Sequence, residues 1–225
     1  NHLHDGLRHW LIMKLPKVER GKRAVVLGRT GSGKTSGALW LVSRSPGPWV
    51  MLNVKYDEAM TKCGPDCAMD VGAIIKAHAK HRVVVVHPET FDQATLDDFV
   101  FELAESRHGC GLCVDEMLYL SKGNGQAGPG VMGWLTRGRA RKQSFIGCTQ
   151  RPANVSNYIY SEADYYMLYN LKLEKDWQRI TEFTGRPDLK RERVNHCFAW
   201  YDVSEDRKTE FGAVPMQGLF ERFKG

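Results

Sequence analysis

Short apolar runs alternate with amphipathic stretches along most of this chain. Runs such as Ala24–Leu27 and Val83–Val86 are typical of strands that are buried on both faces of a sheet. Between such runs, apolar residues recur at helical spacing, as they do from Leu96 to Leu103. This alternation predicts an α/β fold with a mostly parallel central sheet flanked by helices.

The predicted elements follow one another in a regular order. A helix is predicted to begin at Thr95–Asp98, which resembles a capping box. A C-terminal β-hairpin is predicted around the turn Ser204–Asp206. No internal repeat or low-complexity linker interrupts the chain, so a single domain is predicted over residues 1–225, with a core at about 22–185 and the hairpin and tail at about 186–225. The other predicted strands are residues 24–27, 49–54, 82–87, 111–114, 144–149 and 165–171, those of the hairpin are 196–203 and 209–214, and the other helices are 34–43, 71–79, 131–142 and 176–184.

The segment Gly28–Thr35 carries the first chemical signal. Its sequence, GRTGSGKT, fits the pattern GxxxxGK[ST] and lies between a predicted strand and a predicted helix, which is the position of a P-loop. Glycines let the backbone curl so that successive N–H groups face phosphate oxygens, and the following helix adds its positive end. Lys34 is expected to reach the β- and γ-phosphates, and Thr35 to bind Mg²⁺. The predicted nucleotide-binding residues are Gly28, Arg29, Thr30, Gly31, Ser32, Gly33, Lys34, Thr35 and Ser36.

Polar residues follow two later strands. The apolar residues Leu112–Val114 are followed by Asp115 and Glu116, which is a Walker B pattern. In a parallel sheet, residues that follow a strand lie at the same edge as the P-loop. Asp115 is expected to hold Mg²⁺, and Glu116 to polarise the water that attacks the γ-phosphate. Gln150 directly follows the strand 144–149, which in such sheets commonly lies between the P-loop strand and the Walker B strand. Its amide can donate to phosphate and accept from water, so Gln150 is predicted to be a sensor.

At these residues the chain resembles the FtsK/HerA superfamily of DNA-translocating ATPases. The resemblance rests on Gly28–Thr35, on Asp115–Glu116 and on Arg139 ahead of Thr149–Pro152, and it covers about residues 24–185. Within the superfamily, the chain is most similar to genome-packaging ATPases of tailless icosahedral viruses with an internal membrane. The resemblance implies a homo-oligomeric ring, a pentamer or a hexamer, that threads double-stranded DNA. It also implies partners among capsid-vertex or membrane proteins, and action in the host cytoplasm and at the virion packaging vertex.

The predicted function is therefore an ATPase motor that uses ATP and Mg²⁺ to translocate double-stranded DNA into a preformed procapsid. In the family, an arginine from the neighbouring subunit completes each site, and Arg139 matches it. Gly138 and the polar stretch 141–143 depart from the family pattern. These departures leave Arg137, Arg139 and Arg141 all open as the trans-acting arginine.

Three alternative functions remain. The first is another P-loop motor, for phage assembly or conjugation. The second is a small P-loop phosphotransferase, which the carboxylate pair on the Walker B strand and Gln150 disfavour. The third is a nucleotide-binding scaffold without turnover, which Glu116 argues against.

Composition changes this interpretation little. A net charge of +6 favours a polyanionic partner only weakly. The segment Lys122–Gln126 suits either a DNA-facing loop or an idle surface loop.

No apolar run approaches the roughly 18 residues that a membrane-spanning helix needs, so no transmembrane segment is expected. The spacing of four cysteines hints at zinc, but one of them lies in a predicted core strand, which favours reduced thiols; these are Cys63, Cys67, Cys110 and Cys113.

Overall fold

Nine strands form one sheet in the computed structural model, which describes residues 15–122 and 125–223. Their order is β11-β10-β9-β1-β8-β5-β2-β4-β3. All neighbours from β9 to β3 are parallel, whereas β10 pairs antiparallel with β9 and with β11. The strands are β1 (Arg23–Leu27), β2 (Trp49–Leu52), β3 (Asp66–Cys67), β4 (Val83–Val86), β5 (Gly111–Val114), β8 (Ser144–Thr149), β9 (Tyr165–Leu168), β10 (Phe198–Asp202) and β11 (Arg207–Phe211).

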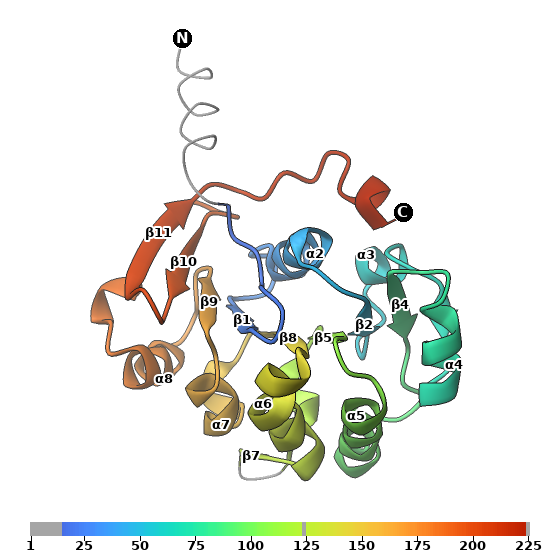
Figure 1. Ribbon diagram of the computed structural model, residues 1–225. Helices are drawn as coiled ribbons and strands as arrows, with labels where there is room; N and C mark the ends of the chain where they lie inside the picture. Colours follow the sequence, from blue (N-terminus) through green and yellow to red (C-terminus); the bar gives the residue numbers. More distant parts are fainter. Residues whose placement is uncertain (1–14, 123–124, 224–225) are drawn as a thin grey trace.

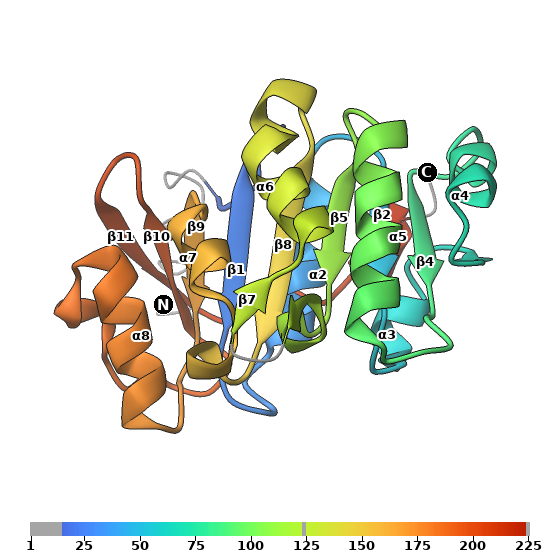
Figure 2. The same cartoon turned by 90° about the horizontal axis from the view of Figure 1, so that it is seen from below.

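Helices cover both faces of this sheet, so the predicted α/β P-loop fold is confirmed. The helices α2 and α3 lie on one face, and α5, α6, α7 and α8 lie on the other (Figures 1 and 2). The C-terminal segment after β11 returns across the α2 face (Figure 1). The helices are α2 (Lys34–Arg44), α3 (Glu58–Thr61), α4 (Val71–Ala77), α5 (Gln93–Ser106), α6 (Pro129–Arg141), α7 (Asn157–Ser161) and α8 (Glu174–Thr184).

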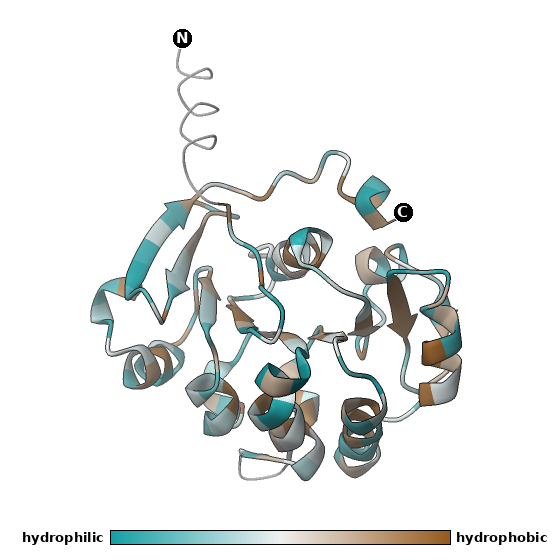
Figure 3. Ribbon diagram, in the orientation of Figure 1, coloured by the Kyte–Doolittle hydropathy of each residue, from teal (hydrophilic) through white to brown (hydrophobic). Residues whose placement is uncertain are grey.

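Each face of the sheet has its own apolar core, because side chains alternate along each strand. Val25 and Leu27 of β1 pack with residues of α5, α6 and α8. Ala24 and Val26 belong instead to the cluster on the other face, which includes residues of α2 and the C-terminal residues Leu219 and Phe223. The inner strands are therefore apolar on both sides, and Figure 3 shows β4 as a brown, hydrophobic arrow inside the molecule.

The strand order fixes which residues meet at the functional edge. As predicted, β8 lies between β1 and β5. The register pairs Leu27 of β1 with Thr149 of β8, and Val114 of β5 with Gly147 of β8. The loop after β1, the residues after β5 and the residues after β8 therefore lie together at one edge.

The predicted capping box at Thr95–Asp98 is wrong. The helix α5 begins earlier, at Gln93, and Asp92 caps it by accepting a hydrogen bond from the Thr95 N–H at 2.9 Å. The buried Asp97 side chain instead accepts bonds from the Gly130 and Val131 N–H groups at the start of α6, both at 3.0 Å. The pattern does not act as a capping box because Thr95 is the third residue of α5 and its N–H is already bound by the true N-cap, Asp92.

Short elements that were not predicted fill the connections. The helices α3 and α7 and the two-residue strand β3 are too short for periodicity to reveal them. The strands β6 (Ser121–Lys122) and β7 (Gln126–Ala127) pair antiparallel on either side of the candidate DNA-facing loop. In contrast, α8 ends where predicted, at Gly185, whose φ of +66° is in the left-handed region that favours glycine. The hairpin of β10 and β11 is also confirmed.

Candidate functional site for nucleotide binding and hydrolysis

The P-loop connects the end of β1 to the start of α2. Gly31 and Gly33 have φ of +74° and +99°, which L-residues with a side chain rarely adopt. Gly33 occupies the N-cap position of α2 and supplies no capping side chain. The first N–H groups of the helix are therefore left for another acceptor, such as a phosphate. Thr35 and Ser36 lie half-buried in this first turn.

The loop is anchored to the neighbouring strands. The Arg29 N–H donates to the Asn170 carbonyl at 2.7 Å, and the Gly28 N–H donates to the Thr149 carbonyl at 3.3 Å. A Cβ atom at Gly28 would lie 2.5 Å from Ser32 Oγ and 2.6 Å from Tyr169 Cβ. Glycine is required here because the loop folds directly onto its own serine and onto the residue that follows β9.

The side chain of Lys34 folds back over the start of the P-loop. Its Nζ donates to the Arg29 carbonyl at 2.9 Å. Burial lowers the pKa of Lys34 below its ordinary value, and the nearby Lys55 ammonium acts in the same direction, whereas Glu116 opposes it. The ammonium group is thus held over the P-loop by a single neutral carbonyl, and its role toward a phosphate stays a prediction.

Asp115 lies at the end of β5 and is 4% exposed. Its Oδ1 accepts from the Val54 N–H at 3.0 Å, and its Oδ2 accepts from the Lys55 N–H at 2.9 Å. Burial raises the pKa of Asp115, and these amide bonds act against that rise. A carboxylate has about four lone-pair positions, so two bonds leave capacity for a further ligand. Carboxylate and hydroxyl oxygens are ligands that suit Mg²⁺, so the assignment of Asp115 and Thr35 to a magnesium ion stays a prediction.

Glu116 is also almost completely buried, with 4% of the residue exposed. Its Oε2 lies 3.6 Å from Lys55 Nζ. Its Oε1 has no hydrogen-bond partner within the described part of the chain. A buried carboxylate oxygen without a partner is costly, so this atom is available to a water or ligand at the site.

Gln150 connects the end of β8 to the P-loop. Its Oε1 accepts a hydrogen bond from the Thr30 hydroxyl. Both residues line a cavity of about 690 Å³ beside the loop. Arg29, Gly31, Arg151, Lys172, Leu173 and Asn195 line the rest of this cavity. The structure therefore brings together Lys34, Glu116 and Gln150, as predicted from three separate motifs, whereas their roles stay predictions.

Arg151 and Asp176 form a pair that sequence reasoning missed. Asp176 in the first turn of α8 is completely buried, and its Oδ1 accepts from the Ala153 N–H at 3.0 Å. Its Oδ2 lies 3.4 Å from Arg151 Nε. The pair fixes the segment after β8, next to Gln150. Arg151 was visible in the motif Thr149–Pro152, but only the fold reveals its partner.

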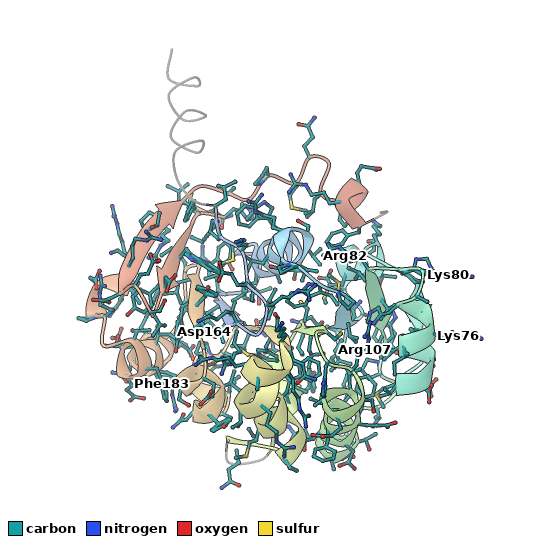
Figure 4. The ribbon with its side chains drawn as sticks, in the orientation of Figure 1. Lys76, Lys80, Arg82, Arg107, Asp164 and Phe183 are labelled. Carbon is teal, nitrogen blue, oxygen red and sulfur yellow. The ribbon has the colours of Figure 1, made fainter. Side chains whose placement is uncertain are left out.

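The three candidate arginines lie on α6, away from the P-loop of their own chain. The helix precedes β8, so its C-terminal end lies at the opposite sheet edge. Arg141 makes a bidentate contact with Glu105 at 2.7 and 2.8 Å, and Arg137 contacts the same carboxylate at 3.0 Å. Arg139 makes one contact, to Asp164 at 3.2 Å, and its side chain is 66% exposed (Asp164 is labelled in Figure 4).

The cysteines do not gather into a metal site. In the described ranges, no three or more His, Cys, Asp or Glu residues are placed to hold a metal ion. All six cysteines are free thiols, and burial raises the pKa of Cys110 and Cys148 to about 12. The hint of zinc is not supported, and Cys113 is fully buried in β5, as its apolar run predicted.

Two other predictions concern the candidate DNA-facing loop and membrane-spanning helices. Within the candidate DNA-facing loop Lys122–Gln126, Gly123 and Asn124 lie outside them, so the role of this loop stays a prediction. No helix within residues 15–122 and 125–223 is long and apolar enough to cross a membrane.

The chain is similar in sequence to a known DNA packaging ATPase. No protein-family model matches the chain. The chain is 27% identical, over 166 residues, to the DNA packaging ATPase P9 of Enterobacteria phage PRD1, and the match covers 72% of this chain and 70% of P9.

Solved structures of a viral protein share the fold. The genome packaging NTPase B204 of Sulfolobus turreted icosahedral virus 2, in complex with ATP-gammaS, matches with a TM-score of 0.73 and 16% identity over 87% of this chain and 98% of B204. B204 of Sulfolobus turreted icosahedral virus, a DNA-packaging ATPase, matches with a TM-score of 0.69 and 17% identity over 87% and 99%. The match to P9 and the shared fold confirm the resemblance to genome-packaging ATPases of the FtsK/HerA type and the prediction of an ATPase.

Proposed function

We propose that this chain, which resembles viral genome-packaging ATPases, uses ATP hydrolysis to move double-stranded DNA into a preformed procapsid. The observation that carries the proposal is the convergence of Lys34, Glu116 and Gln150 behind three adjacent parallel strands. Phosphoryl transfer depends mostly on positioning and charge, and this edge supplies a cation, a carboxylate and an amide around one phosphate-binding loop.

The P-loop would bind the triphosphate through its own backbone. The N–H groups of Gly31–Ser36 and the start of α2 face the phosphates, and Lys34 exchanges the Arg29 carbonyl for the β- and γ-phosphate oxygens. Thr35 and Asp115 would hold Mg²⁺, which neutralises charge on those oxygens when it is bound. Arg29 and the cavity beside it lie at the open side of the loop, where nucleotide enters.

Glu116 would orient the attacking water. The water forms a bond to the γ-phosphorus while the bond from that phosphorus to the β–γ bridging oxygen breaks, so ADP and phosphate leave. The unpartnered Oε1 of Glu116 would accept a hydrogen bond from this water, and the proton that the water loses leaves with the released phosphate. Gln150 exchanges its bond with Thr30 for the γ-phosphate and the water. This exchange would let the P-loop respond to the loss of the γ-phosphate.

The motor would work as a homo-oligomeric ring of five or six copies. Arg139 lies too far from its own P-loop edge to serve it, and its exposed side chain suits a contact with the site of a neighbouring copy. We place the whole chain in a single ATPase domain, with Lys122–Gln126 as a candidate DNA-facing segment. Its partners would be capsid-vertex or membrane proteins, in the host cytoplasm and at the packaging vertex.

ATP hydrolysis with and without double-stranded DNA tests this function. DNA should stimulate phosphate release, and Glu116→Gln should bind ATP but release little phosphate. Transfer of phosphate to an added nucleotide would instead identify a phosphotransferase. The absence of turnover in the wild-type chain, with DNA present, would identify a nucleotide-binding scaffold.

A further inference from the structure

The segment between β2 and α3, residues 53–57, contacts both Walker B carboxylates. Its Val54 and Lys55 N–H groups each donate to one oxygen of Asp115. The side chain of the same Lys55 lies 3.6 Å from Glu116 Oε2. One lysine therefore binds Asp115 with its backbone and Glu116 with its side chain.

The conformation of this segment is fixed by its own residues. Asn53 is completely buried, and its side chain donates to the Asp57 carbonyl at 2.9 Å and accepts from the Asp57 N–H at 2.7 Å. Tyr56 has a φ of +55°, in the left-handed region, and its ring stacks on His87 with centroids 4.9 Å apart. A bulky residue persists in this region only where its surroundings impose it, so the backbone of Lys55 is held firmly.

A cation beside Glu116 can keep its position during hydrolysis only if the phosphates of the nucleotide do not bind that cation themselves. The charges of Lys34 and Lys55 both act at this site. Lys34 belongs to the P-loop, where phosphates engage it. Lys55 comes from another element and remains for Glu116. Because Oε2 faces Lys55 and Oε1 has no described partner, the ion pair leaves one oxygen of the carboxylate for a further bond.

We infer that Lys55 is a positioning residue for hydrolysis, which holds Glu116 Oε2 so that Oε1 faces the attacking water. This inference rests on the proposed ATPase function of the same site. Lys55 acts through Glu116 and does not itself touch the nucleotide. Its side chain is 41% exposed, so solvent screens the pair and its removal should affect rate rather than folding.

Steady-state ATP hydrolysis and ATP binding should be compared among wild type, Lys55→Ala and Lys55→Arg. Misplacing a reacting group by about 1 Å can reduce a rate about 100-fold, so Lys55→Ala should lower kcat by about 10- to 100-fold, with the Kd for ATP changed by less than about threefold. Lys55→Arg should restore part of kcat because a guanidinium also pairs with a carboxylate. Lys62→Ala is the matched control: Lys62 pairs with Glu58, which is exposed, and its loss should leave both quantities unchanged.

A double-mutant cycle with Glu116→Gln then tests whether Lys55 acts through Glu116. In single-turnover experiments, Lys55→Ala should add little to the loss caused by Glu116→Gln. Equal losses in both backgrounds, or weaker ATP binding in both, would overturn the inference, because Lys55 would then act on the nucleotide. If Lys55→Ala fails to fold, Lys55→Met keeps most of the apolar stem. An active wild type with an equally active Lys55→Ala refutes this inference alone, whereas an inactive wild type refutes the proposed function.

Discussion

Arg139 Nη2 donates to Asp164 Oδ1 at 3.2 Å, at the edge of the sheet opposite to the P-loop. Asp164 also accepts from Lys22 Nζ at 2.9 Å and from the Arg23 side chain at 3.0 Å. Two other cations therefore neutralise this carboxylate without Arg139. Arg139 can therefore leave Asp164 without uncovering an unpaired charge, and its one described contact distinguishes it from Arg141, whose Nη1 and Nη2 both bind Glu105.

We expect Arg139→Ala to bind ATP normally and to lose DNA-stimulated hydrolysis. An arginine supplied by a neighbouring subunit is worth about 10³–10⁵ in rate for phosphoryl transfer. Mixing Arg139→Ala subunits with Glu116→Gln subunits should restore part of the turnover, because some interfaces then combine an intact arginine with an intact glutamate. Phosphate release from mixed and unmixed samples measures this recovery.

The control for this experiment is Arg20→Ala, which removes an exposed arginine that is not a candidate for the trans role. Its hydrolysis should resemble that of the wild type. If mixed rings form but show no recovery, the trans role does not belong to Arg139. Arg137→Ala or Arg141→Ala should then be mixed with Glu116→Gln in the same way.

Lys34→Ala should abolish tight ATP binding. The substitution removes a charged donor to the β- and γ-phosphates, and a hydrogen bond to a charged group is worth about 1.5–3 kcal/mol, or roughly 10- to 150-fold in Kd. Isothermal titration with a non-hydrolysable ATP analogue measures the change. Lys175→Ala, which removes an exposed lysine from α8, should titrate like the wild type. An unchanged Kd for Lys34→Ala would refute the assignment of the P-loop.

DNA binding should be indifferent to sequence and should weaken steeply with salt. Neutralising phosphates releases counterions, so the affinity for duplex DNA should fall about tenfold or more between low and physiological salt. Two duplexes of equal length and unrelated sequence should give the same Kd and the same salt slope in fluorescence anisotropy. A flat salt response, or a strong preference for one duplex, contradicts a motor that grips the phosphate backbone.

Asp97→Ala should lower the free energy of unfolding by about 1–3 kcal/mol. The substitution leaves the buried N–H groups of Gly130 and Val131 without their acceptor at the start of α6. Chemical denaturation measures the change. Asp98→Ala removes the neighbouring carboxylate, which is exposed, and should leave the midpoint unchanged. A midpoint for Asp97→Ala equal to that of Asp98→Ala would show that the contact contributes nothing to stability.

The sequence predicts those parts of the fold and the site that depend on local patterns. Short apolar runs predict the inner strands of the sheet. The segment Gly28–Thr35 predicts the P-loop, because the turn, the phosphate-binding backbone and the start of the helix all lie within these eight residues. The position of β8 between β1 and β5 follows from the same motif, since it belongs to a known kind of sheet.

Contacts between distant segments could not be predicted in this way. In the sequence, Lys55 is an ordinary lysine that follows a strand. No pattern around it indicates that it contacts Glu116, which lies 61 positions later. Thr95–Asp98 resembles a capping box in the sequence, and only the fold shows that Asp92 caps the helix and that Asp97 accepts hydrogen bonds from the start of α6. In the sequence, Asp176 is an ordinary acidic residue in the first turn of a helix. Its ion pair with Arg151 could not be predicted, because it depends on how distant segments pack in the fold.

The two borders of the sheet limit how copies of this chain can associate. One border strand, β3, has only two residues, and the other, β11, carries Arg207, Lys208 and Glu210 among its five residues. Short or charged border strands discourage backbone pairing with another molecule. In the proposed ring, neighbouring copies would therefore meet through side chains and loops rather than through a continuous backbone ladder. Such an interface could rearrange in every cycle of the proposed motor without breaking backbone hydrogen bonds.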